Sequence, residues 1–534
     1  MFLSLGENMI VIKEIIIKSE DDFSKLEAEI NKIQKGYLTE DCEGNIGTIS
    51  EIKDSLWKEN KKLKVMIEYP YYDKEYLNEY SNYYCKKFNI PSNKTFRLIF
   101  YSKNKSNKYD VMGYIILVPT PSLNHIGRIS FNPSFLLDSA SLILTDCKMH
   151  FDGKKETFKM FPHARQYGLT ACGHVSIWAV SKFGGSNWDR FSDTDFEQIV
   201  NTVSIINPKT KISPPELTVA QIAGVLADFG YRPLFKPYVE DNQDDFLCEL
   251  YSYIDSEIPL VLLDRKYNHA LVGLGYQRAY SYQFMSSPIK SLIAFEQDNY
   301  DTINCVSNIL INDSKSNDYI SNEIKVYSDK IFYNSVIVND DNSFPYRKIT
   351  LYGNDVNTSS AVQTDLSLLN LLGFIVPIYP RINIEFSDVK DFSNYLISSK
   401  GLDLGFIKEN QNNVFVRIFL ASANKCREHI YEQSKHNLYA KKIYSVLRTV
   451  ELSKLCWVIE YSSYEEQISD RISGFSLIDS TCTFNDNNLS LFNCGRNVLE
   501  YYDNEEKKHF SKPLDITNNK ALYLHKFNKN LTNL

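Results

Sequence analysis

One cysteine in this sequence stands where a thiol can become a nucleophile. Cys172 follows the loop-like segment "ARQYGLTA" (164–171) and opens the apolar run "CGHVSIWAVSKF" (172–183). The run predicts a buried helix that stops at Gly184 and Gly185, so Cys172 falls in its first turn. The unpaired backbone N–H groups and the positive end of the helix dipole favour the thiolate form there.

A cysteine nucleophile also needs a base and donors for the oxyanion. Gln166 stands six residues before Cys172, so its amide can donate beside the backbone N–H of Cys172. Of nine histidines, His269 opens the strand-like run "HALVGLGY" (269–276), and strand ends present side chains from a rigid scaffold. His174 follows Cys172 on the same helix but faces another side, and His163 is the alternative base.

The third member of such a site is a polar group that holds the histidine. Asp313 ends the run "NILIND" (308–313), and neighbouring strands place their ends side by side. We therefore expect Asp313 to orient His269, with Asp298 and Asn312 as the reserves.

This order of residues resembles the papain-like cysteine peptidases, and most closely their bacteriocin-processing, double-glycine leader-peptidase branch. The likeness rests on Gln166 and Cys172-Gly173, on "ELTVAQIAGVLADFGY" (216–231) and on the block around His269, and it covers residues 160–320. It implies that Gln166 is the oxyanion donor, Cys172 the nucleophile, His269 the base and Asp313 the orienter, with no cofactor or metal. The chain departs from the family in having His174 after Cys-Gly and a lengthened segment at 277–307.

The remaining patterns predict an α+β architecture in three parts. Strand-like and helical runs mix in an N-terminal domain (1–150) and in a C-terminal domain (326–534). Between them, residues 151–325 are expected to form the papain-like domain, a helix bundle with a small antiparallel sheet. The helical segment 424–450 carries a break near Asn437, and the charged tail after Tyr502 is expected to fray.

Composition limits the classes of function. The net charge of −7 argues against nucleic acid as a partner, and the basic stretch 93–108 reads as the solvated ends of one strand. No apolar run reaches the roughly 18 residues of a membrane span, and the start lacks the features of a secretory signal. The ten cysteines are scattered without a CxxC pair, which indicates reduced thiols in the cytoplasm. The abundance of Asn, Ile, Lys and Tyr is typical of a bacterial protein.

These observations predict an intracellular cysteine peptidase that cleaves a specific protein substrate. The flanking domains or the segment 277–307 are expected to restrain it until a regulatory partner or signal acts, for example in a bacterial defence or stress response. Two alternatives stay open: a silent peptidase-like scaffold that binds a partner, and a transglutaminase or amidase on the same fold. Gln166 disfavours a further Cys-His-Asp enzyme, the arylamine acetyltransferase, which lacks this residue.

Overall fold

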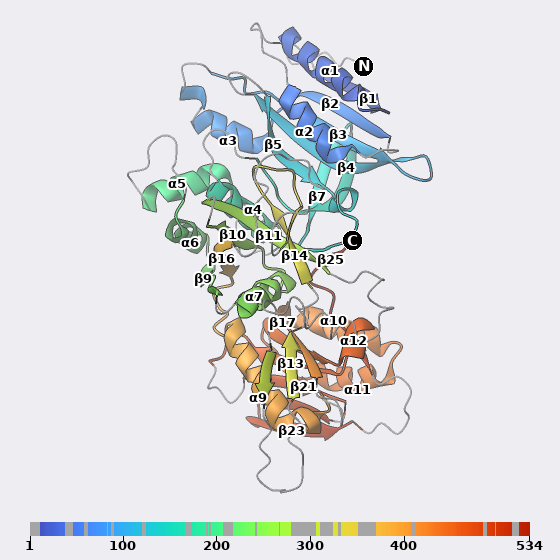
Figure 1. Ribbon diagram of the computed structural model, residues 1–534, viewed down its shortest axis with the longest axis vertical. Helices are drawn as coiled ribbons and strands as arrows, with labels where there is room; N and C mark the ends of the chain where they lie inside the picture. Colours follow the sequence, from blue (N-terminus) through green and yellow to red (C-terminus); the bar gives the residue numbers. More distant parts are fainter. Residues whose placement is uncertain are drawn as a thin grey trace.

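In the computed structural model, the chain is a mixed α/β structure whose three large sheets follow one another along its long axis (Figure 1). About 34% of it is helix and 39% strand. The structure describes residues 11–37, 46–57, 62–82, 84–86, 90–119, 124–165, 172–187, 191, 194–206, 217–240, 243–265, 268–278, 306–309, 324–328, 333–350, 370–406, 413–483, 489–496, 498–514 and 523–534. The prediction that helices and antiparallel sheets are combined is confirmed.

The N-terminal sheet is antiparallel and covered on both faces. Its strands are β1 (Val11–Ile17), β2 (Leu63–Tyr71), β3 (Thr95–Lys103), β4 (Tyr109–Pro119) and β5 (Asn124–Phe131). One face packs against α1 (Asp22–Tyr37) and α2 (Ile46–Leu56), and the other against α3 (Lys74–Asn82) and the hairpin of β7 (Thr145–Phe151) and β8 (Lys154–Met160). Burial on both faces explains why the middle of β3 reads as a continuous apolar run.

The central sheet carries the candidate site. In spatial order its main strands are β15 (Arg347–Thr350), β14 (Tyr333–Asn339), β11 (His269–Arg278), β10 (Leu260–Asp264), β16 (Leu371–Ile378) and β9 (Arg232–Pro237). β11 and β14 are antiparallel neighbours, with Val272 opposite Asn339. Because the two strands run in opposite directions, the residues that precede Val272 lie next to the residues that follow Asn339. This register brings the start of the His269 strand to the turn after β14.

The helix that begins at Cys172 packs against β11 and is buried on almost every side. It is α4 (Cys172–Asn187), and α5 (Phe196–Ile206) and α6 (Val219–Asp228) lie beside it. The predicted stop at Gly184 is wrong, because Gly184 serves packing within the helix: a Cβ there would overlap the hydroxyl of Tyr231. Gly230, in contrast, has a φ of +91° and follows α6 as expected.

The C-terminal sheet is built from two separate stretches of sequence. One lies between two strands of the central sheet, and the other comes later in the chain. Its order is β12 (Val306–Ile309), β13 (Ile324–Ser328), β17 (Asn413–Ser422), β18 (Leu455–Ser462), β20 (Gly474–Asp479), β21 (Ser490–Cys494), β22 (Val498–Asp503) and β23 (Lys508–Pro513). Helices α10 (Ala423–Ser434) and α11 (Leu438–Leu447) cover one face, and α9 (Phe386–Leu404) and α7 (Gln243–Asp255) pack on the other. The predicted break is confirmed, since the Asn437 side chain caps α11.

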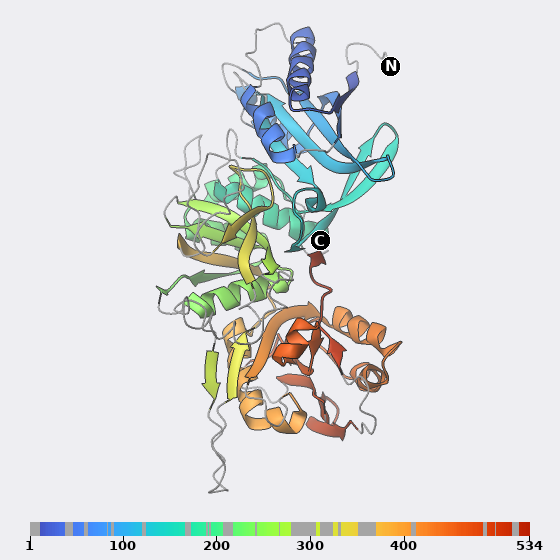
Figure 2. The ribbon, with the colours of Figure 1, turned by 45° about the vertical axis from the view of Figure 1, so that its right-hand side comes forward.

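The chain leaves the central sheet after β11 and returns to it as β14. Between these strands β12 and β13 join the C-terminal sheet, where β13 pairs with β17 (Figure 2). Residues 308 and 309, the described part of the run "NILIND", lie in the C-terminal sheet, so the expectation that the run lies beside the His269 strand is wrong for these two residues. Asp313 lies outside the described residues, as do Asp298, Asn312 and almost all of the segment 277–307.

The C-terminal tail joins two sheets, and the expectation that it frays is wrong for its described residues. Its strand β24 (Leu524–His525) pairs with β19 (Arg471–Ile472), next to the short helix α12 (Tyr464–Ile468). Its last strand, β25 (Thr532–Asn533), pairs with β6 (Ser141–Leu142), which in turn pairs with β11. The tail is thus part of the sheet that carries His269.

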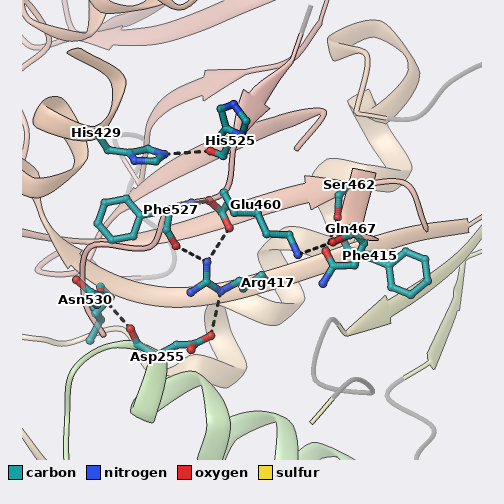
Figure 3. A network of polar contacts seen from close by, with 12 residues as sticks. Asp255, Phe415, Arg417, His429, Glu460, Ser462, Gln467, His525, Phe527 and Asn530 are labelled. Carbon is teal, nitrogen blue, oxygen red and sulfur yellow. Dashed lines mark hydrogen bonds and ion pairs between the residues drawn. The ribbon is translucent and has the colours of Figure 1, made fainter. Parts of the chain in front are cut away.

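A buried network of charged side chains ties the tail to the C-terminal sheet and to α7, which also packs against β10 and β11 (Figure 3). Arg417 on β17 donates to Asp255 of α7 at 3.0 Å, to Glu460 of β18 at 3.1 Å and to the backbone oxygen of Phe527 at 2.6 Å. Asn530 donates to the backbone oxygens of Asp255 and Leu420. The three charged side chains are at most 7% exposed, so each depends on the others for compensation.

Within the described part of the chain, no helix combines the length and apolar character that crossing a membrane requires. Seven described cysteines are free thiols, namely Cys85, Cys147, Cys172, Cys426, Cys456, Cys482 and Cys494. Cys248 is disulfide-bonded, so the expectation of reduced thiols throughout the chain is wrong for this residue.

Arg417→Met should destabilise the protein strongly, because it leaves Asp255 and Glu460 buried without their shared cation. Breaking a buried ion pair in this way costs about 3–5 kcal/mol. Urea unfolding followed by tryptophan fluorescence measures the change, since Trp457 is buried in β18. Lys435→Ala removes an exposed ion pair with Glu432 and is the control, for which no change is expected. Equal unfolding curves for the two variants would contradict the role of the network.

Candidate active site

The structure brings Cys172 and His269 into contact at the start of two packed elements. Cys172 is the first residue of α4, and His269 is the first residue of β11, against which α4 packs (Figure 1). The Cys172 thiol lies close enough to His269 to raise the pKa of the imidazole. Both are largely buried, with 7% and 6% of their surface exposed. A thiol at a helix start thus lies close to an imidazole at a strand start.

Asp340 holds the other side of the imidazole. His269 Nε2 lies 2.9 Å from Asp340 Oδ1, which leaves Nδ1 as the ring nitrogen for the thiol. Asp340 follows β14 and also accepts hydrogen bonds from the backbone N–H of Asn342 at 3.0 Å and from Arg347 Nη1 at 2.8 Å. Three donors therefore fix this carboxylate, and the order Cys172, His269, Asp340 is that of a nucleophile, a base and an orienter.

The charges around His269 favour its protonated form. Burial lowers the pKa of His269, but the hydrogen bonds to Asp340 and Cys172 and the charges of Asp340 and Asp341 raise it to about 10. Burial raises the pKa of Asp340. The hydrogen bond and charge of His269, the hydrogen bond of the Asn342 backbone and the charge of Arg347 outweigh this and bring the pKa below its ordinary value. At neutral pH the two groups form a buried imidazolium–carboxylate pair.

A second carboxylate lies beside the first. Asp341 Oδ1 is 3.4 Å from His269 Nε2. The ligand atoms of His269, Asp340 and Asp341 all lie within 4.8 Å of one another, so their types and spacing would also suit a divalent cation. Arg347 competes with that arrangement, because its guanidinium already places a positive charge on Asp340. The hydrogen-bonded description accounts for Asp340 without an ion.

The N-terminal sheet holds the backbone on both sides of this site. The backbone N–H of Ile129 donates to His163 O and that of Arg165 donates to Gly127 O, so the segment leading toward Gln166 lies along the edge of β5. The Arg165 side chain donates to Asp341 O at 2.9 Å and forms an ion pair with Glu51 of α2.

The turn after β14 is anchored in the same way. The Tyr346 hydroxyl donates to Phe131 O at 2.9 Å, and the ring of Phe344 packs against that of Phe131. The turn that carries Asp340 and the segment before Cys172 therefore share one support.

The structure places His269 close to Cys172, as expected from the sequence, and beside Asp340, which the sequence did not single out. Gln166 and Asp313 lie outside the described residues, so their predicted roles stay predictions. A signal for Asp340 was present, because "SVIVND" (335–340) is an apolar strand that ends in Asn-Asp just as "NILIND" does. Sequence alone could not decide which of the two strands pairs with β11.

The alternative histidines have other surroundings. His163 Nε2 lies 3.1 Å from Ser343 O, behind the Asp340 turn. Burial lowers the pKa of His163 to about 3, so its imidazole is neutral and serves the packing of the turn. His174 is fully buried within α4.

No known relative supplies a function by comparison. No protein-family model matches the chain, and the curated proteins and the solved structures compared with it give no significant match. Any function must therefore be argued from the contacts of these residues.

Asp340→Asn should lower the pKa of His269, because it removes the nearest negative charge. The expected fall is about one to three pH units, as for the loss of an opposite charge at contact. Titration of ¹⁵N-histidine-labelled protein by NMR measures it, and His269→Gln identifies the signal. The signal of His429, which contacts the backbone oxygen of His525 in the C-terminal part, should not move. An unchanged titration of His269 would show that Asp340 does not set its protonation.

Proposed function

We propose that this protein is a cysteine peptidase in which Cys172 is the nucleophile, His269 the proton carrier and Asp340 the orienter. One observation supports the proposal above the rest: a buried, continuous set of contacts from Cys172 through His269 to Asp340 at the start of α4. The resemblance to papain-like peptidases adds the substrate class, a peptide bond in a protein.

The chemistry follows from the resting charges. The thiolate of Cys172 attacks the carbonyl carbon of the peptide bond, and an oxyanion forms on the carbonyl oxygen. The backbone N–H of Cys172 and the amide of Gln166 are the proposed donors to it. The imidazolium of His269 gives its proton to the leaving amine nitrogen, and a thioester remains on Cys172. Water then attacks the thioester and gives a proton to His269. The carbon–sulfur bond breaks, which releases the acid and restores the thiolate–imidazolium pair.

The flanking parts are proposed to control this site. The N-terminal sheet contacts both the segment before Gln166 and the turn that carries Asp340, through Gly127, Ile129 and Phe131. The C-terminal sheet contains β12 and β13, which lie in the connection between the His269 and Asp340 strands. A partner that displaces either sheet would thereby alter the geometry of the site.

Asp340→Asn should lower the rate of peptide cleavage by about 10²–10⁴-fold, as the loss of an orienting carboxylate does in hydrolytic triads. Asp313→Asn is the matched variant and should retain the parental rate. Denatured casein serves as the substrate, and mass spectrometry of new N-termini measures the rate. Cys172→Ala should yield no new termini.

Three outcomes would overturn parts of the proposal. If Asp313→Asn loses activity and Asp340→Asn keeps it, the orienter is Asp313. If no termini form but a biotinylated amine is joined to casein in a Cys172-dependent reaction, the protein is a transglutaminase. If neither reaction occurs with the folded protein, with or without deletion of residues 279–305, the scaffold alternative replaces the enzyme.

A further inference from the structure

Asp341 is a buried acid whose carboxylate takes no part in the hydrogen bonds of the described residues. Its side chain is 2% exposed, and neither carboxylate oxygen has a hydrogen-bond partner among the residues that the structure describes. Its neighbour Asp340 has three donors. A buried polar group without a hydrogen bond destabilises a fold, so a carboxylate in this turn is unexpected unless it has another role.

The turn itself does not provide that reason. Arg165 contacts Asp341 through the backbone oxygen, at 2.9 Å from Nε. The Ser343 N–H closes the turn on the backbone oxygen of Asp340. An asparagine at position 341 would keep these backbone contacts and avoid a buried charge. Among the described residues, the carboxylate faces His269 Nε2 at 3.4 Å, and this contact is the one that accounts for its charge.

The charged and titratable groups around His269 come from every element packed on it. Cys172 faces it from α4, Asp340 and Asp341 from the turn after β14, and Asp264 stands opposite it on β10. Positive charge enters through Arg347, which contacts Asp340, and through Arg165, which acts on Asp341. Burial and the charge of Asp340 raise the pKa of Asp341, whereas the charges of His269 and Arg165 lower it. The result is a pKa of about 7.

We propose that Asp341 is a positioning residue that acts through His269, where its ionised carboxylate retains the imidazolium proton and extends the thiolate–imidazolium pair to alkaline pH. The sign follows from the charges. The pKa of His269, about 10, lies above its ordinary value of 6.5, so the imidazolium is present below pH 10 and lost as the pH rises through it. Removing the charge of Asp341 must lower that upper limit. The role of the pair in catalysis rests on the proposed function, but its pH range does not.

Alkylation of Cys172 by iodoacetamide tests this without any substrate. The rate is measured from pH 5 to 11 by peptide mapping of the full chain, with Cys85→Ser to remove an exposed thiol. A thiolate becomes more reactive when its neighbouring imidazolium loses a proton, so the alkaline step in the rate reports His269. The parent should show this step near pH 10. Asp341→Asn should move the step down by about one pH unit or more, and Asp341→Glu should restore part of the shift.

The outcomes separate this inference from the proposed function. A step that stays in place in folded Asp341→Asn overturns the inference, even if the parent cleaves casein. A step that moves while casein stays intact supports the inference and counts against the peptidase. A merely structural Asp341 would change the melting temperature and leave the step where it is. If Asp341→Asn does not fold, Asp341→Ser makes the same test with a smaller side chain.

Discussion

The hydrogen bond between His269 and Asp340 is the contact on which the rest of the candidate site depends. It buries a cation and an anion at one end of the central sheet, and such a pair is tolerated only where its remaining donors and acceptors are satisfied. Arg347 and the Asn342 N–H do this for Asp340, and Cys172 does it for the free side of the imidazole. The same bond requires β11 and β14 to be neighbours, which fixes the order of strands in the central sheet.

The chain takes an indirect path between these two strands. The two strands are neighbours in space, yet the connection between them passes through the C-terminal sheet as β12 and β13. At the far end of β11, the strand pairs with β6, and β6 pairs with β25 near the last residue of the sequence. The N-terminal sheet holds the turn after β14 through Phe131. All three parts of the chain thus bear on the geometry of one histidine and one carboxylate.

Local patterns predicted the elements well, and the partners of those elements less well. The apolar run after Cys172 indicated a buried helix, and the alternation of strand and turn residues located β3, β4, β5, β10 and β11, because these signals lie within a few residues of sequence. Gly184 was misread because a glycine is needed there to make room for the Tyr231 hydroxyl, and Tyr231 is too far away in sequence for a local pattern to reveal the contact. Asp340 was missed for the same physical cause: two strand-like runs of the sequence end in Asn-Asp, and only tertiary pairing distinguishes them. The tail was expected to fray from its charges, whereas Phe527 and Asn530 are held by buried partners.

The central claim is that Cys172 is an activated nucleophile because His269 and Asp340 stand behind it. The most direct measurement is labelling of the full chain with a chloroacetamide probe at neutral pH, followed by intact mass and peptide mapping. The account predicts one rapid adduct on Cys172, although Cys85 and Cys482 are more exposed, and a much slower reaction of Cys172 in His269→Ala. Labelling of Cys85 and Cys482 first, with Cys172 unmodified or indifferent to His269→Ala, would contradict it.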